Sequence, residues 1–140
     1  MQHLFEGAKG SKIELPIILA SFYGLRRSEV LGLKWDAFDF VNNTISIQHT
    51  LTTCTIDGKK LEVASDITKT KSSRRTLPLI PQFKQMLLAR WEQQKEYKRV
   101  YVKFYNKRYV DYICVDEMGN IINPGYLTNS FAKLLEKNNL

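Results

Sequence analysis

The sequence predicts an α+β fold that is mainly helical with a small three-stranded antiparallel sheet. The apolar residues have helical spacing toward both ends of the chain, and the spacing changes toward two between residues 39 and 79. Its 140 residues, 44% hydrophobic and 25% charged, are enough for one folded domain and exclude a disordered tail. Because there is no internal repeat and no linker, residues 1–140 are treated as one unit.

Two helices are predicted near the start. Residues 12–23 are apolar nearly all round, which is typical of a buried helix, and Pro16 is tolerated there only in a first turn. Gly24 predicts the break at its C-terminal end. Residues 28–33 predict a short second helix that turns Val30, Leu31 and Leu33 inward.

The middle of the chain predicts the sheet. Residues 44–48 alternate, residues 51–56 are rich in β-branched side chains, and Asp57-Gly58 is typical of a hairpin turn. We expect the last strand at 75–79, where Pro78 and Pro81 end the pairing. The polar stretch 65–74 is placed as a hairpin tip that faces solvent or a ligand.

After Pro81 the three- and four-residue spacing returns and predicts the longest helix, about six turns up to Phe104. Its second half interleaves Lys and Arg with tyrosines. That pattern is typical of a phosphate-tracking face with stacking rings, and more often of a buried aromatic stripe beside a solvated basic one. We expect a short strand at 112–115 and a final helix at 126–137, entered through Asn123-Pro124.

The net charge of +7 is regional. Residues 59–108 hold fourteen Lys or Arg and four Asp or Glu, a net +10, while the other ninety residues carry a net −3. A block of this kind attracts polyanions, of which nucleic acid is the commonest in cytosol. On charge alone, a solvated Lys-rich surface explains the block equally well.

Several classes of protein are excluded. The longest apolar stretch is too short for a membrane-spanning helix, and the start of the chain does not resemble a secretory signal, so we expect a cytoplasmic protein without a membrane partner. Cys54 and Cys114 are sixty residues apart and form neither a disulfide framework nor, with His3 and His49, a zinc site. We expect no metal and no cofactor.

Two short segments carry candidate chemistry. In YGLRRSEVLGLKW (residues 23–35), Arg26 follows the glycine bend and can point into a cleft, and Glu29 lies one turn later, where it could hold a guanidinium in one rotamer. A fixed guanidinium fork suits a bidentate grip on phosphate. In TKTKSSRRTLPL (68–79), lysines at a hairpin tip could deliver a proton to a ligand bound elsewhere. Taken alone, the first segment is better explained by an ordinary arginine–glutamate ion pair. The second segment, taken alone, is better explained by a solvated turn.

Together, in this order and about forty residues apart, the two segments resemble the catalytic domain of tyrosine recombinases, the phage integrase family. The resemblance runs through a G-L-R-x-S-E-x-L-x-L-x-W box, a T-K-T-x-x-S-x-R-x-x-P-L hairpin, a long helix, and a final N-P-x-Y-L and F-x-K helix. It implies the catalytic core of a DNA breaking and rejoining enzyme that acts through a 3′-phosphotyrosyl intermediate in DNA recombination and integration. It further implies double-stranded DNA as partner and a tetramer on DNA for the parent enzyme.

The resemblance assigns roles residue by residue. Arg26 corresponds to the first catalytic arginine, which grips the scissile phosphate, and Glu29 to the acidic residue that supports the active-site arginines. Lys69 corresponds to the general acid toward the leaving 5′ oxygen, with Lys71 as a nearby rival. Further candidates for contacting DNA are Arg27, Lys71, Arg74 and Arg75.

Later parts of the family pattern have no counterpart in the 140 residues. There is no H-x-x-R box, both histidines precede residue 50, and arm-binding and core-binding domains are absent upstream. We therefore expect a partial catalytic domain that has no nucleophile among its seven tyrosines and cannot cleave DNA. Two other hypotheses remain: a helix-turn-helix regulator built on residues 28–35, and a basic structural domain without a nucleic-acid role.

Overall fold

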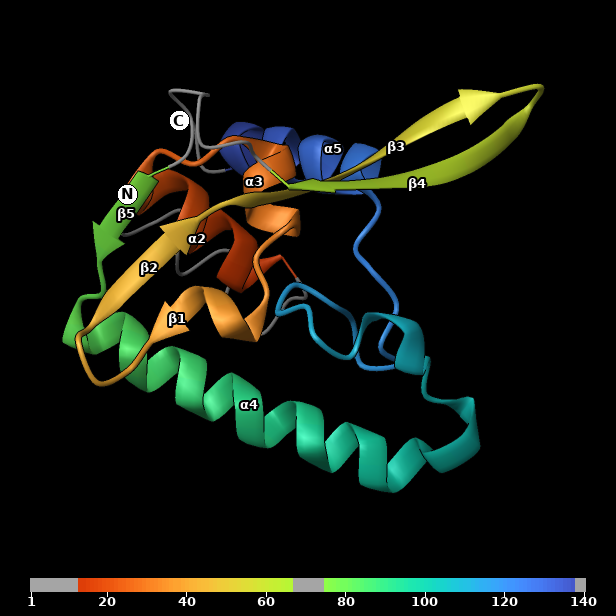
Figure 1. Cartoon of the computed structure of the whole chain (residues 1–140). Helices are drawn as coiled ribbons and strands as arrows, with labels where there is room; N and C mark the ends of the chain where they lie inside the picture. Colours follow the sequence, from red (N-terminus) through yellow and green to blue (C-terminus); the bar gives the residue numbers. More distant parts are fainter. Residues whose placement is uncertain (1–12, 67–74, 138–140) are drawn as a thin grey trace.

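The computed structural model describes residues 13–66 and 75–137. It confirms the predicted α+β class, with more helix than strand (Figure 1). In chain order the elements are α2 (Glu14–Tyr23), α3 (Arg27–Leu31), the 3₁₀ turn η1 (Trp35–Ala37), β1 (Phe38–Asp39), β2 (Thr44–Ile47), β3 (His49–Ile56), β4 (Lys59–Asp66), β5 (Arg75–Pro78), α4 (Pro81–Tyr101), the 3₁₀ turns η2 (Val102–Phe104) and η3 (Lys107–Tyr109), and α5 (Pro124–Lys137).

The core forms where α2, α3, the sheet and the first half of α4 meet. Leu19 of α2, Ile45 of β2 and Leu87 of α4 are fully buried in one cluster, together with Ile113 of the segment before α5. Pro16 lies in the first turn of α2, and Gly24 ends that helix with a left-handed φ of 67°, both as predicted. The helix predicted to be buried nearly all round is fully buried only over four consecutive residues, Pro16 to Leu19, and Phe22 near its end is 50% exposed.

A three-stranded antiparallel sheet is present as predicted, in the order β1-β2-β5, but residues 51–56, which were expected in it, lie outside it, and β1 supplies the third strand. β2 pairs with β5 in a register that sets Ile47 opposite Arg75 and Thr44 opposite Pro78. On the other side of β2, the two residues of β1 pair with Thr44 and Ile45. The sheet therefore brings residue 75 next to the end of β2, close to α3.

The hairpin tip expected at 65–74 is contradicted at its first two residues, whereas the hairpin turn predicted at Asp57-Gly58 is confirmed. Residues 49–66 form a separate two-stranded ribbon, β3–β4, whose tip is Asp57-Gly58, and Ser65 and Asp66 are the last residues of β4 (Figure 1). The tip takes positive φ angles at both residues, 52° and 76°, as a two-residue hairpin turn of this kind requires. Every residue of β4 is exposed, because the ribbon projects away from the body. Residues 67–74 lie outside the described residues.

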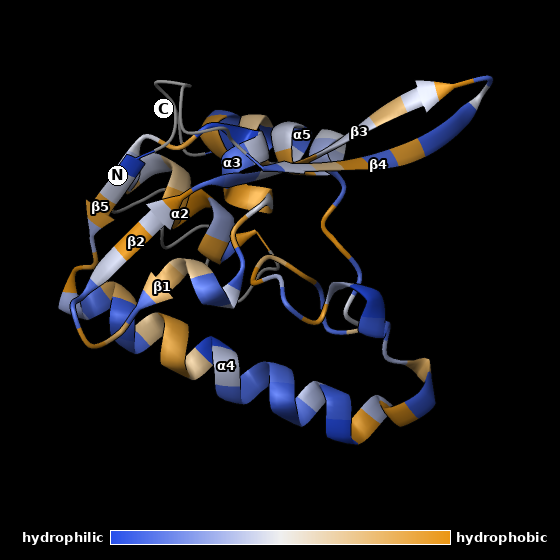
Figure 2. Cartoon of the chain, viewed as in Figure 1, coloured by the Kyte–Doolittle hydropathy of each residue, from blue (hydrophilic) through white to orange (hydrophobic). Residues whose placement is uncertain are grey.

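α4 confirms the predicted long helix, although it ends at Tyr101 and not at Phe104, which lies in η2, and the predicted aromatic stripe is only partly buried. Phe83 and Leu87 are buried, whereas Trp91 is 42% and Phe104 69% exposed. Tyr105 and Tyr109, in the turns after the helix, are buried again. Figure 2 shows the reason: apolar residues of α4 concentrate in its first half, which packs on the core, and its second half is mainly hydrophilic.

The chain between α4 and α5 differs from the prediction at residues 112–115. These residues form no strand: Tyr112 makes an isolated bridge with Lys34, and Val115 makes another with Ile121. The segment is buried as if it were a strand, which explains its apolar sequence, but no neighbouring strand continues either bridge. α5 is entered through Asn123-Pro124 as predicted but begins at Pro124, two residues earlier than expected, and the Asn123 side chain accepts hydrogen bonds from the backbone N–H groups of residues 125 and 126.

One glycine allows α3 to pack directly on the ribbon. A Cβ atom at Gly32 would lie 2.5 Å from the His49 carbonyl oxygen and 2.6 Å from the Thr50 Cα, which are backbone atoms that cannot rotate away. Gly32 has an ordinary negative φ, so its requirement is space and not backbone conformation. This contact fixes the distance between α3 and the start of β3.

We expect Gly32→Ala to lower the free energy of unfolding by about 3 kcal/mol, because the backbone of α3 or β3 must move. Gly58→Ala is the matched control: a Cβ there meets nothing within 4 Å, and only the positive φ opposes it, so a loss of about 1 kcal/mol is expected. Urea unfolding followed by circular dichroism measures both. Equal losses in the two variants would contradict the close-packing argument.

Candidate functional site

The candidate site is built around the bend between α2 and α3. Leu25 is buried and anchors the bend, and Arg26 has an extended backbone directly before the first residue of α3. The Arg26 side chain is exposed, and it has no ion-pair partner among the residues that the structure describes. Its guanidinium therefore starts from a bend and is exposed to solvent, and its role in binding phosphate stays a prediction.

Glu29 is the centre of the site. It is only 2% exposed, and its Oε1 accepts a hydrogen bond of 2.9 Å from the backbone N–H of Arg26. Its Oε2 lies 2.8 Å from Nη1 of Arg75, and its Oε1 lies 3.2 Å from Nη2 of the same guanidinium. This is a bidentate pair between α3 and β5. The guanidinium that Glu29 holds is thus that of Arg75, whereas Arg26 is held through its backbone.

The protonation of Glu29 follows from these contacts. Burial alone raises the pKa of a carboxyl group, but the hydrogen bonds from Arg75 and the Arg26 backbone, with the positive charges of both arginines, lower the pKa of Glu29 overall. In turn, the hydrogen bond to Glu29 raises the pKa of Arg75. Both groups stay charged at neutral pH, and the carboxylate holds the Arg75 guanidinium in one orientation.

The remaining predicted site residues fall into two groups. Arg27 Nη1 donates to the Thr128 hydroxyl at 2.7 Å and to the Pro124 carbonyl at 3.4 Å, so its guanidinium connects α3 with α5. Its contact with DNA stays a prediction. Three others lie outside the described residues, immediately before Arg75 in sequence: Lys69, Lys71 and Arg74.

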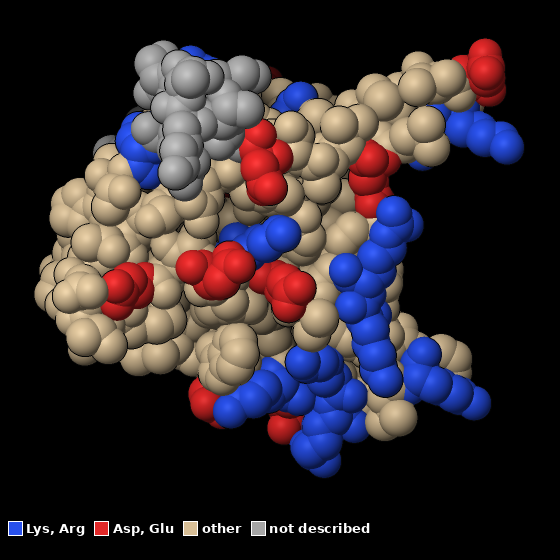
Figure 3. Space-filling model, in the orientation of Figure 1, with Lys and Arg blue, Asp and Glu red and all other residues tan. Residues whose placement is uncertain are grey.

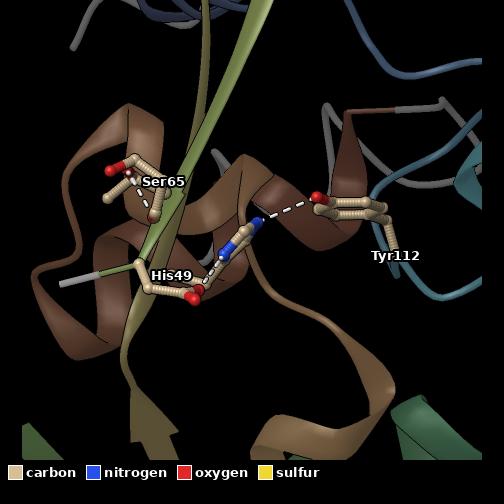
Figure 4. Close-up of polar contacts among 5 residues, drawn as sticks. His49, Ser65 and Tyr112 are labelled. Atoms are coloured by element: carbon tan, nitrogen blue, oxygen red, sulfur yellow. Dashed lines mark hydrogen bonds and ion pairs between the residues drawn. The ribbon is translucent and has the colours of Figure 1, made fainter.

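The sequence did not single out the cluster at the base of the ribbon. His49 Nδ1 lies 2.7 Å from Asp66 Oδ1, and its Nε2 lies 2.8 Å from the Tyr112 hydroxyl (Figure 4). The order carboxylate, imidazole, hydroxyl is that of an activated nucleophile. However, burial raises the pKa of Tyr112, and nearby carboxylates raise it further. The cluster therefore keeps the phenol protonated and fastens the ribbon to the body.

Gln94 is a second polar residue that the sequence analysis did not single out. Although it occupies a core position of α4, its amide accepts from the Trp35 indole at 2.8 Å and donates to the Tyr112 carbonyl at 3.1 Å. Those bonds satisfy a side chain that is 4% exposed. A polar residue in a buried helical position was the available signal. Gln94 thereby fixes the chain segment that carries Tyr112.

Three further observations concern residues 13–66 and 75–137 only. In this part of the chain no helix combines the length and the apolar character needed to cross a bilayer. The same residues contain no group of three or more His, Cys, Asp or Glu that could hold a metal ion. Cys54 and Cys114 are free thiols, and burial raises the pKa of Cys114 to about 12.

The comparisons with known proteins found similarity in sequence and in fold. No protein-family model matches the chain. The chain is 32% identical, over 140 aligned residues, to a protein of Caldanaerobacter subterraneus subsp. tengcongensis named "Tyrosine recombinase XerC-like". The alignment covers 94% of this chain and 35% of that protein, so the chain spans about a third of the length of its relative.

Solved structures show the same fold. The integrase of the Tn1549 transposon, in complex with a circular intermediate DNA, superposes with a TM-score of 0.73 at 20% identity, covering 99% of this chain and 42% of the integrase. A second complex of that integrase with circular intermediate DNA gives 0.73 at 21% identity, and a complex with transposon right end DNA gives 0.66 at 22%. At these identities the likeness establishes the fold.

We expect Arg75→Met to reverse the effect of Glu29 on the pH dependence of stability. In the native chain the lowered pKa of Glu29 contributes stability above its unfolded pKa of about 4.3, and this is lost as pH falls through the folded pKa. Without Arg75 the buried carboxylate lacks its guanidinium, its pKa rises, and stability falls as pH increases above about 4.3.

At pH 7 the loss should be about 2–3 kcal/mol, below the range for fully buried pairs because the Arg75 side chain is 32% exposed. Urea unfolding at pH 4 and pH 7 measures both effects. Arg99→Met removes an exposed helical pair with Glu96 and serves as the control, for which we expect no measurable change. A variant of Arg75 that remains more stable at pH 7 than at pH 4 would contradict the argument.

Proposed function

The chain belongs to the tyrosine recombinase family, spanning about a third of a relative's length, and we propose that it supplies part of the phosphate-binding site of a DNA strand-breaking and rejoining enzyme. One observation supports this most directly. The carboxylate of Glu29 accepts a hydrogen bond from the backbone of Arg26 in the segment 23–35. It also binds the guanidinium of Arg75 in the segment 68–79. Two segments about forty residues apart thus form one positively charged site.

Arg26 is proposed to bind the scissile phosphate. Attack on a phosphodiester builds negative charge on the nonbridging oxygens, and a guanidinium that is already oriented stabilises that charge without reorganisation. Arg26 offers an exposed guanidinium on a fixed backbone, and the guanidinium that is already oriented beside it is that of Arg75. Glu29 acts through its neighbours: it is a positioning residue that holds Arg26 by its amide and Arg75 by its side chain.

Lys69 is proposed as the general acid that protonates the leaving 5′ oxygen, with Lys71 as the alternative. An alkoxide leaves poorly unless it is protonated, and a placed acid contributes about 10² to 10⁴ in rate. A lysine with an ordinary pKa of about 10.4 needs that pKa lowered for this role, and neighbouring guanidinium groups have that effect. Both lysines precede Arg75 by a few residues, which supports their placement near the same phosphate.

Double-stranded DNA is the proposed partner, and a tetramer on DNA is the proposed assembly of the parent enzyme. The net +10 of residues 59–108 and the family of the relative support the DNA partner. Among the alternatives, the helix-turn-helix hypothesis needs a second helix shortly after α3. The structure has η1 and the strands β1 and β2 there instead.

None of the tyrosines is proposed as the nucleophile. Tyr105, Tyr109 and Tyr112 are buried, and the Tyr23 hydroxyl accepts a hydrogen bond from the Ile80 amide. A nucleophile must reach the phosphorus atom in line with the leaving oxygen. Buried and bonded phenols do not meet that requirement, so the proposal leaves attack to a tyrosine outside these positions.

Duplex binding over a range of salt tests the phosphate role of Arg26. We expect Arg26→Ala to reduce the slope of log affinity against log salt by about 1, because one phosphate contact is lost. Arg26→Lys should keep the slope and bind more weakly, because an ammonium makes no bidentate pair. Lys137→Ala, an exposed position of α5, is the control and should match the native chain. Native binding by Arg26→Ala throughout would contradict the role.

A nicked suicide substrate tests the absence of a nucleophile. We expect the 140-residue chain to form no covalent adduct with DNA, because none of its seven tyrosines follows an H-x-x-R box, after which the family pattern carries its nucleophile. Denaturing gel electrophoresis of the labelled substrate, with a complete tyrosine recombinase as positive control, gives the measurement. A protein-linked 3′ phosphate would overturn this part of the proposal, and peptide mapping would then identify the tyrosine.

A further inference from the structure

A basic surface lies at the far end of α4, away from Arg26. Residues 95–108 hold six Lys or Arg and one Glu, a net +5. The side chains that form the surface are exposed, and Figure 3 shows Lys and Arg gathered over the second half of α4 and the turns that follow it. We define the α4-end surface as the side chains of Lys95, Arg99, Lys103, Lys107 and Arg108.

Two of these lysines have few competing contacts. Lys95 and Arg99 each pair with a glutamate three residues earlier, and Arg108 lies 4.0 Å from Glu62 of the ribbon. Lys103 and Lys107 have no ion pair with any residue in the described part of the chain. Their ammonium groups are therefore the ones most available to an external anion.

An exposed aromatic ring lies within this surface. Phe104 is 69% exposed, and the Lys103 ammonium lies 5.4 Å from its ring centroid. Val102, with a left-handed φ of 45°, ends α4 and is itself 63% exposed. Burial in the core does not explain an aromatic ring and a β-branched side chain at the tip of a charged helix.

We propose that the α4-end surface is a second DNA-contacting surface, which binds backbone phosphates of duplex DNA through Lys103 and Lys107 and packs Phe104 against the sugar edge. This inference rests on the proposed DNA function, but it uses none of the residues of the Arg26 site. The charge complementarity is direct, since each neutralised phosphate releases condensed counterions. In the DNA backbone sugars and phosphates alternate, so an aromatic ring beside an ammonium group can contact both.

Charge also decides against a second copy of the chain as occupant. Two copies meeting through a two-fold axis would bring one net +5 surface against another, and like charges at an interface oppose association. An acidic polypeptide remains the competing class of partner, and the experiment below separates it from DNA.

The length of α4 separates this surface from the start of the helix. Its 21 residues span about 30 Å.

The experiment uses the 140-residue chain and a duplex of about three helical turns, with binding followed by fluorescence anisotropy between about 50 and 200 mM salt. For the double variant Lys103→Ala/Lys107→Ala we expect the slope to fall by about 2, since each phosphate contact contributes about 0.9. The matched control Lys133→Ala/Lys137→Ala makes the same change in net charge on exposed positions of α5 and should leave the slope unchanged. Phe104→Ala should weaken binding with the slope unchanged.

Several outcomes would overturn the inference. Equal slopes for the two double variants would show that only net charge matters. Competition by polyglutamate as effective as by unlabelled duplex would assign the surface to acidic polypeptides. If Arg26→Ala lowers the salt slope and the double variant Lys103→Ala/Lys107→Ala does not, the proposed function stands and the α4-end surface has no part in it. The reverse result would support the surface and contradict the Arg26 site.

Discussion

The structure depends on one buried carboxylate. Glu29 is almost completely buried on a five-residue helix, and a charge in that position persists only because the Arg26 amide and the Arg75 guanidinium satisfy it. The same contacts join the bend after α2 to the first residue of β5. The two carboxylate oxygens accept hydrogen bonds from three N–H donors. They therefore fix the orientation of the two segments as well as the distance between them.

The scaffold around that pair is arranged to hold it. Gly32 lets α3 lie against the backbone of His49 and Thr50, and the register of β2 and β5 sets Ile47 opposite Arg75. The hydrogen bonds of His49 then fix the start of the ribbon on the body. Stability and function thus share contacts: the interactions that close the core also orient the positive charges proposed to meet a phosphate.

Charge on this chain falls into two groups that differ in mobility. Arg75 is held by a buried partner and is therefore oriented, as transition-state stabilisation requires. The lysines at the end of α4 are exposed on flexible stems, which suits contacts that contribute affinity and depend on salt. The proposed function needs both kinds of charge, one to hold a duplex and the other to act on one phosphate. The long α4 separates them in space.

The sequence by itself determined the helices, the sheet class and the two boxes, because helical periodicity, the glycine at residue 24 and short motifs are local signals. It also placed Glu29 beside a guanidinium. Only the tertiary structure decided that this guanidinium belongs to Arg75, that residues 49–66 form a separate ribbon, and that residues 112–115 are buried without a strand. These depend on contacts between segments far apart in the chain, whose pairing and register no local pattern encodes.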